Sequence, residues 1–214
     1  MDERARPTVL RHPDGQVFPF DAGALCLELY LTGGEGRRSR FEILHEPGDF
    51  LTWAAGSRLD PAGHGVDVAG LTARPADLAR VKRLREAVWE LARSVSLGDG
   101  LVPEAVATVN EIAAGAAPVP LLDAASGRVL WRQPVSTGQL ITAVARDAVT
   151  TFAPPRAERI RKCADPTCAL VYLDTSRPRT RRWCSMRRCG NRNKIIEYRR
   201  RGRDDDGGGD ARTG

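Results

Sequence analysis

Four of the five cysteines in this chain form two pairs with the same internal spacing. Four residues separate Cys163 from Cys168, four separate Cys184 from Cys189, and fifteen lie between the pairs. This spacing is typical of a structural zinc site, in which four thiolates surround the ion tetrahedrally and leave no open position for a substrate. A short, highly charged segment buries too little apolar surface to fold alone, so metal binding must stabilise it. The pattern predicts one structural Zn²⁺ per chain.

Three other uses of these cysteines are less well supported. Disulfides form in oxidising compartments, but the chain begins Met1-Asp2-Glu3-Arg4 without an apolar signal segment, which favours a reducing cytoplasm. A redox motif would have two residues between its cysteines and one nucleophilic thiol. An iron–sulfur cluster also takes four cysteines, but the surrounding arginines and the paired spacing favour zinc. We therefore expect a cytoplasmic zinc protein.

Positive charge is concentrated around the cysteines. Between Arg156 and Arg203 there are sixteen Arg and Lys residues and four acidic residues, a formal charge of +12. Because the whole chain carries +6, the remainder must sum to −6. A zinc ion with four thiolates contributes about −2, which leaves the segment strongly basic. Such asymmetry indicates a module that binds a polyanion, joined to an acidic globular domain.

The cysteine segment resembles the CGNR zinc finger family. The resemblance is carried by Arg182-Trp183-Cys184-Ser185-Met186 and by Cys189-Gly190-Asn191-Arg192 with Lys194. The upstream cysteine pair, the apolar stretch 170–174 and the dipeptide 176–177 fit the same pattern. Members usually carry an N-terminal helical region, the ABATE domain, and are described as candidate stress-induced transcription regulators. The resemblance implies DNA as the partner and four zinc ligands: Cys163, Cys168, Cys184 and Cys189.

The rest of the chain predicts a mainly α-helical fold with short β-hairpins. Between Pro75 and Val95, apolar residues recur every three or four positions, as on a helix with one buried face. Pro13-Asp14-Gly15 is a turn sequence between apolar pairs and predicts a hairpin over residues 8–20. We likewise expect a second hairpin over 119–133 and further helices over 21–31, 50–55, 103–114, 137–152 and 188–201.

Pro154-Pro155 should separate two parts of the chain, because consecutive prolines end a helix and stiffen the backbone. We expect a helical, ABATE-like sensor domain over 1–153 and a basic zinc finger over 154–203. The last ligand should lie in the first turn of the final helix, as in treble-clef fingers. The acidic, glycine-rich segment 204–214 should be a disordered tail.

Four side chains carry specific expectations. Asp21 should cap the helix that follows it, and Glu28 should face solvent on that helix. Ile195 and Tyr198 share a face of the final helix and should pack on the zinc knuckles, which would leave the arginines facing outward.

The basic module predicts double-stranded DNA as its partner. Arginine pairs bidentately with phosphate and with the guanine edge. The module lacks the alternating aromatic residues of single-strand readers, which favours duplex DNA over RNA. The residues expected to contact nucleic acid are Arg179, Arg181, Arg182, Arg187, Arg188, Arg192, Lys194, Arg199 and Arg200.

These features together indicate a DNA-binding transcription regulator whose front domain senses a small-molecule effector. The alternative is a zinc-dependent adaptor that binds RNA or an acidic protein partner such as the transcription machinery. A lone finger offers little contact area, which favours a homodimer. Paired carboxylates, a nucleophile–base set and an open metal site are all lacking, so we do not expect an enzyme. No apolar run approaches the length of a membrane span.

Overall fold

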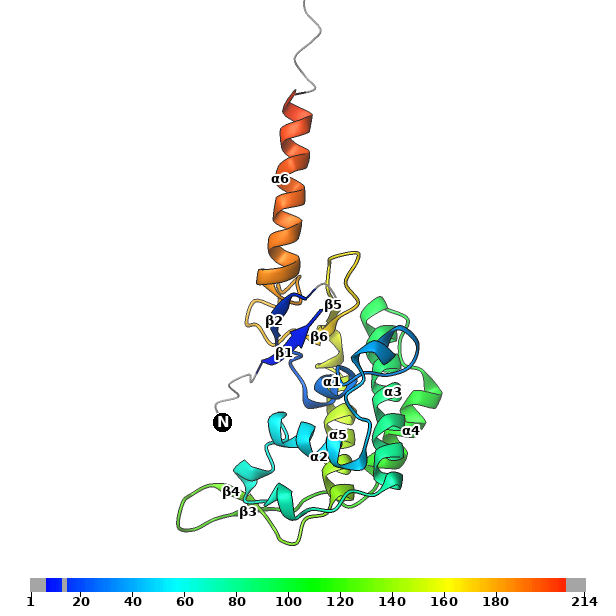
Figure 1. The fold of residues 1–214 in the computed structure, drawn as a ribbon, viewed down its shortest axis with the longest axis vertical. Coiled ribbons are helices and arrows are strands. Elements are labelled where there is room, and N and C mark those ends of the chain that lie inside the picture. Colours follow the sequence, from blue (N-terminus) through cyan, green and yellow to red (C-terminus); the bar gives the residue numbers. More distant parts are fainter. Residues whose placement is uncertain (1–6, 13–14, 207–214) are drawn as a thin grey trace, which may run out of the picture.

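The computed structural model describes residues 7–12 and 15–206. Figure 1 shows a helical body, with one long helix, α6 (Asn191–Asp206), projecting from its upper end. α6 therefore includes the first three residues of the segment expected to be a disordered tail, and the rest of that segment lies outside the described residues. The fold is mainly α-helical with two-stranded antiparallel sheets, as the sequence predicted.

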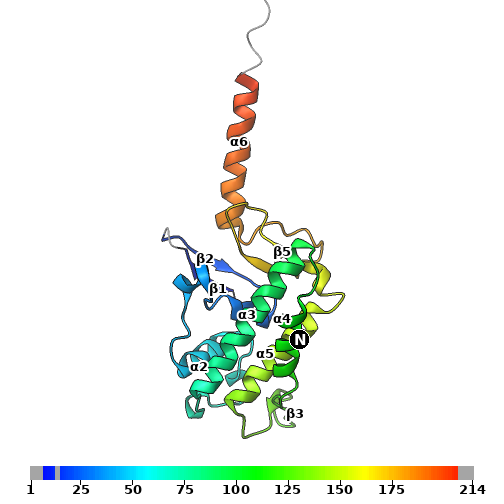
Figure 2. The same ribbon diagram turned by 90° about the vertical axis from the view of Figure 1, so that its right-hand side faces the viewer.

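The body is built on α1 (Leu25–Tyr30), α3 (Pro75–Leu97), α4 (Pro103–Ala113) and α5 (Thr137–Phe152), which pack on one another. α2 (Pro47–Gly56) packs on the side of α3 (Figure 2). The predicted stripe of α3 is buried at Val81, Leu84, Val88 and Leu91. Gly98 ends this helix in the left-handed conformation, with φ of 87°, which glycine adopts without a steric cost. The periodicity therefore identified this helix and its buried face correctly.

Three hairpins complete the architecture. β1 (Thr8–Arg11) pairs with β2 (Val17–Phe20) in the register Thr8 to Phe20, which confirms the hairpin expected there. β3 (Pro120–Leu122) pairs with β4 (Val129–Trp131) at the end of the body opposite α6 (Figure 1). β5 (Ile160–Lys162) pairs with β6 (Val171–Leu173) inside the cysteine-containing segment. Short 3₁₀ turns lie at Gly36–Phe41, Ala62–His64, Val68–Gly70 and Ala157–Arg159.

The cysteine-containing segment packs directly against the body. The buried Tyr30 hydroxyl on α1 donates to the Val171 carbonyl at 2.6 Å and accepts from the Val171 N–H at 2.9 Å. The Leu173 N–H donates to the carbonyl of Ala22 at 2.9 Å. Gly23, with φ of 80°, lies so close that a Cβ there would stand 2.2 Å from the Leu173 carbonyl oxygen. Strand β6 thus shares a continuous apolar core with the helices, beyond the covalent link through Pro154-Pro155.

Two expectations for the start of α1 were wrong. Asp21 does not cap the helix: its carboxylate accepts from the Gly23 N–H at 2.8 Å and forms an ion pair with Arg58. A short-range bond of this kind ties an Asp to its own turn, and α1 begins only at Leu25. Glu28 is not on a solvent face: only 4% of its side chain is exposed, and it forms an ion pair with Arg58 Nε at 2.6 Å.

Replacing Tyr30 by Phe should destabilise the whole chain. The change leaves the N–H and C=O of Val171 without their partner in a buried position, which costs about 1–3 kcal/mol. Urea titration followed by tryptophan fluorescence measures the free energy of unfolding. Tyr198→Phe, at an exposed residue of α6, is the matched control and should leave it unchanged. Equal stability of Tyr30→Phe and the native chain would show that this contact does not join the two parts.

The buried Glu28 carboxyl should make stability depend on pH. Burial raises its pKa from 4.5 to about 7, against the opposing contacts of Arg58. The folded state therefore binds more protons than the unfolded state between these values. The free energy of unfolding should fall by up to roughly 3 kcal/mol as pH rises through this window. Glu28→Gln, which does not titrate, should lose that part of the slope; an unchanged slope would contradict the assignment.

Candidate metal centre and basic helix

The four paired cysteines converge on one point although they come from different segments. Cys163 follows β5, Cys168 precedes β6, Cys184 ends the following loop, and Cys189 lies in the helical turn Met186–Gly190 just before α6. All four are buried, and their sulfur atoms lie within 4.8 Å of one another. The fifth cysteine, Cys26, is buried separately in α1.

The donor set fits a tetrahedral zinc ion. Zn–S bonds of about 2.3 Å place neighbouring sulfurs of a tetrahedral site about 3.8 Å apart. The Sγ atoms of Cys168 and Cys184 are 3.8 Å apart, and those of Cys184 and Cys189 are 3.5 Å apart. The Cys184 N–H donates a hydrogen bond to Cys163 Sγ at 3.3 Å, as expected when a backbone amide stabilises a thiolate ligand. The cysteines therefore hold one structural zinc, as the spacing predicted.

Protons must leave these thiols when the metal binds. Burial, followed by the charges of neighbouring sulfurs, raises the pKa of Cys189 to about 12. Like charges confined so closely cannot all ionise without a cation. Zinc supplies that positive charge, so metal binding and folding of the segment are coupled to release of protons.

Asp165, which lies between Cys163 and Cys168, links this cysteine pair to the base of α6. Its carboxylate accepts from Arg192 Nε at 2.9 Å, from Asn193 Nδ2 at 2.7 Å and from the Thr167 hydroxyl at 2.7 Å. Asn193 also donates to the Cys189 carbonyl at 2.9 Å. Burial would raise the pKa of the Asp165 carboxyl, but the hydrogen bonds from Arg192 and Thr167 outweigh burial and lower it. The charged network fixes where α6 starts relative to the metal.

Gly190 has a steric role beside the last ligand. A Cβ at this position would lie 2.6 Å from the Met186 sulfur and 3.3 Å from the Trp183 ring. Trp183 is half-buried and packs against the apolar core. The helical turn can therefore close tightly over the metal ligands.

Arg181 is directed inward, although the sequence placed it among the nucleic-acid contacts. Its guanidinium lies 3.9 Å from the Tyr172 ring centroid and donates to the carbonyls of Trp183, Cys184 and Asp21 at 3.1, 2.8 and 2.8 Å. Three backbone acceptors and an aromatic face occupy this cation. Arg181 joins the zinc finger to the front of the chain.

Two further arginines predicted to contact nucleic acid, Arg188 and Arg192, also have partners within the protein. Arg192 is engaged by Asp165, with a shortest N–O distance of 2.5 Å. Arg188 is buried, with its guanidinium 4.9 Å from the Phe18 ring centroid. Total charge cannot separate such arginines from surface ones, since only the fold decides which cations find internal partners.

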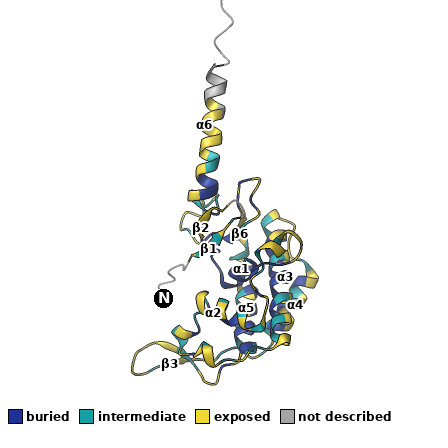
Figure 3. Cartoon of the chain, viewed as in Figure 1, coloured by how far each residue is buried: buried dark blue, intermediate teal, exposed yellow. Residues whose placement is uncertain are grey.

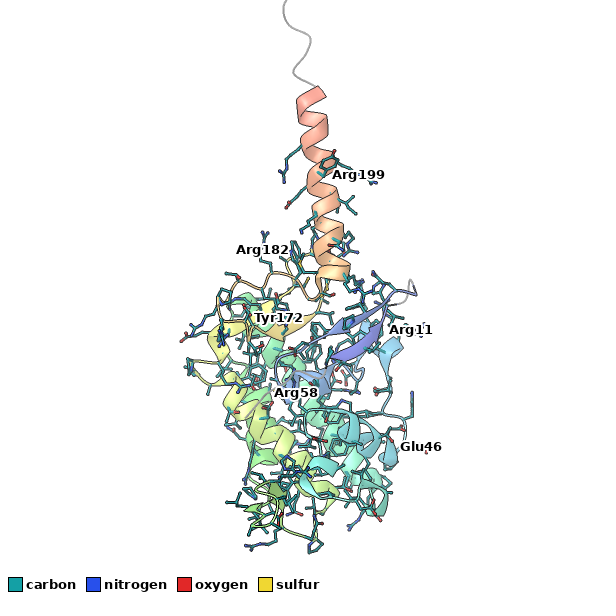
Figure 4. All side chains as sticks on the ribbon, turned by 90° about the vertical axis from the view of Figure 1, so that its left-hand side faces the viewer. Arg11, Glu46, Arg58, Tyr172, Arg182 and Arg199 are labelled. Atoms are coloured by element: carbon teal, nitrogen blue, oxygen red, sulfur yellow. The ribbon has the colours of Figure 1, made fainter. Side chains whose placement is uncertain are left out.

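The remaining predicted cations whose side chains the structure describes lie at the surface. Figure 4 shows Arg182 beside the base of α6 and Arg199 on the part that projects from the body. The side chain of Arg200 is outside the described residues. The exposed cations of the predicted set are Arg179, Arg182, Arg187, Lys194 and Arg199.

α6 presents apolar residues to solvent as well. Ile195 and Tyr198 do not pack on the knuckles: Tyr198 is 79% exposed, and Ile195 and Ile196 are about half exposed. The expectation failed because only the first turn of α6 contacts the module, and Figure 3 shows exposed residues along most of its length. Of the described helices, none combines the length and apolar character needed to cross a membrane.

Loss of one ligand should abolish stoichiometric zinc binding. Cys184→Ser removes a sulfur that lies between two others in the cluster, so the purified variant should lose most of its bound zinc and unfold at lower urea concentration. Elemental analysis measures the metal. Cys26→Ser, at the buried cysteine of α1, is the matched control and should retain one zinc per chain. Stoichiometric zinc in Cys184→Ser would contradict the four-cysteine site.

Comparison with known families agrees with this geometry. Residues 23–155 match the ABATE family, described as "putative stress-induced transcription regulator", and residues 159–202 match the CGNR zinc finger. A comparison with curated proteins finds no match. The ABATE match covers more than half of the 214 residues, and the zinc finger match contains all four converging cysteines. The chain therefore belongs to the ABATE family of regulatory proteins and carries a C-terminal CGNR zinc finger.

Proposed function

We propose that this protein regulates transcription by binding duplex DNA through α6 and the loop before the zinc finger's second cysteine pair. The observation that carries the proposal is the projection of α6 from the body with exposed cations, two of which have no carboxylate partner among the described residues (Figures 1 and 4). Lys194 and Arg199 form no ion pair within the described part of the chain, and Arg201 meets only Glu197 at 3.8 Å on the same helix.

The dimensions of α6 suit the major groove. Sixteen helical residues span about 24 Å, and the groove, about 12 Å wide, admits one α-helix. Lys194 and Arg201 are seven residues apart and share one side of the helix, whereas Arg199 lies on another. A helix in the groove has phosphates on both sides, so cations on more than one side are favourable.

The loop that precedes Cys184 is arranged to present additional cations. The Asp174 carboxylate accepts from the Ser176 N–H at 2.9 Å and from the Arg181 N–H at 3.0 Å, which holds both ends of the loop. Between them, Arg179 is exposed in the left-handed conformation, with φ of 53°. Arg182 is also exposed, although its neighbour Arg181 is directed inward. Both exposed arginines can contact the DNA backbone beside α6.

The apolar residues of α6 support a second candidate function. Ile195, Ile196 and Tyr198 are exposed on the same helix as the cations, a mixture suited to an acidic protein surface. A protein of this kind would act as an adaptor to the transcription machinery, and the same residues would serve a homodimer. Nucleic acid remains the better proposal because exposed cations extend beyond α6 to the preceding loop.

Removing exposed cations should weaken DNA binding and its salt dependence together. The triple variant Arg182→Ala, Lys194→Ala, Arg199→Ala should bind random duplex DNA at least tenfold more weakly. Each lost phosphate contact should reduce the slope of log K against log salt by about 0.9. Fluorescence anisotropy at several salt concentrations measures both quantities.

The matched control is Arg37→Ala, Arg93→Ala, Arg132→Ala. It removes three exposed cations from the body, with the same change in net charge. It should retain native affinity. Equal losses in the two triple variants would indicate general electrostatic attraction and refute this interface. If the native protein ignores duplex DNA at moderate salt but binds purified RNA polymerase, the adaptor function replaces the proposal.

A further inference from the structure

A cavity of about 180 Å³ lies where the front domain meets the zinc finger. The front domain supplies aromatic walls, including Phe18, Tyr30 and Trp89, and the zinc finger supplies residues 167–170 and Arg188. The β1–β2 hairpin, which carries Arg11 and Phe18, lies beside the base of α6 (Figures 1 and 4). The cavity is therefore lined by both the helical front domain and the zinc finger.

Arginines supply most of the charge in the lining of the cavity, and Cys168 of the zinc site is the one described residue there that carries negative charge. The lining includes Arg11, Arg38, Arg40 and Arg188, and no described lining residue is Asp or Glu. Arg38 is neutralised by Glu86 and lies 4.7 Å from the Trp89 ring centroid. The other three arginines form no ion pair with a described residue. The cavity is thus suited to an anion.

Arg188 is the side chain on which this inference rests. It is only 8% exposed, its guanidinium lies 4.9 Å from the Phe18 ring centroid, and its buried Nε has no hydrogen-bond partner among the described residues. Burying a cation without a partner is costly, so buried charges are normally paired. Arg181 and Arg192, which precede and follow it in the sequence, both have hydrogen-bond acceptors within the protein. A ligand anion would supply the hydrogen-bond acceptor that Arg188 Nε lacks.

Size and lining narrow the ligand to one chemical class. A closed apolar cavity of about 150 Å³ holds benzene, so this cavity accommodates one aromatic ring with a small substituent. Guanidinium pairs bidentately with a carboxylate, and the aromatic walls suit a planar apolar body. We propose that the cavity binds a monocyclic aromatic carboxylate, with the ring among Phe18, Tyr30 and Trp89 and the carboxylate on Arg188.

A ligand bound in this cavity would lie close enough to α6 to affect its position. Arg188 belongs to the helical turn Met186–Gly190 that leads into α6, and Cys168, which also lines the cavity, is a zinc ligand. A ligand that pairs with Arg188 favours conformations of this turn that hold the guanidinium inward. This regulatory step rests on the proposed function of DNA binding, whereas ligand binding does not.

Isothermal titration of the zinc-loaded full chain with benzoate tests the site. We expect saturable binding that weakens at least tenfold in Arg188→Gln. Arg177→Gln, an exposed position of the zinc finger, is the matched control and should bind as the native chain does. Benzyl alcohol, which lacks the charge, and inorganic phosphate, which lacks the ring, should each bind at least tenfold more weakly. Absence of saturable benzoate binding, or phosphate binding as tight as benzoate, would overturn the proposal.

A second measurement is independent of how well Arg188→Gln folds. In ¹H–¹⁵N spectra of the native chain, benzoate should shift the Trp89 indole signal and the Leu170 amide and leave Trp53, which does not line the cavity, unchanged. Shifts confined to other regions would place the ligand elsewhere and refute the site. Anisotropy with duplex DNA then separates the two proposals: benzoate binding without any DNA binding retains the cavity and rejects the DNA-binding function.

Discussion

The zinc finger depends on an electrostatic arrangement in which charges of both signs are confined at short range. Four sulfurs within 4.8 Å of one another would repel as thiolates, and zinc makes their convergence favourable. Around them, Asp165 neutralises Arg192, and Arg181 donates to three backbone carbonyls. The metal brings the segments together, and these arginine contacts fix the orientation of α6. A helix that contacts the module only through its first turn needs both.

The zinc finger packs against the helical body because it buries little apolar surface by itself. A module of this size has little core of its own, and it acquires one by adding β6 to the helices of the front domain. Tyr30 and Gly23 make this possible, one through two buried hydrogen bonds and the other by leaving room for the Leu173 carbonyl. The two family regions therefore share one apolar core in this chain, although Pro154-Pro155 lies between them.

Much of this fold could be predicted because local patterns determine it. Cysteine spacing identified the zinc site, and apolar periodicity identified the helices from Pro75 to Phe152. The positions of Glu28 and Ile195 could not be predicted, because burial of a helix face depends on what packs against it. The same holds for Arg181, Arg188 and Arg192: all three stand in an arginine-rich sequence, but their partners lie up to 170 residues away, as Phe18 does from Arg188.

The internal use of these arginines changes how the charge of the module should be interpreted. A polyanion would meet only the cations at the surface, so the area available to the proposed DNA partner is smaller than the formal charge of the segment suggests. The buried arginines serve a different purpose, because each connects the metal site with another part of the chain. Arg181 reaches the carbonyl of Asp21, and Arg188 lies against Phe18 of the N-terminal hairpin. The hairpin is therefore in direct contact with the base of α6, and the proposed regulation of DNA binding by a ligand would require a contact of this kind.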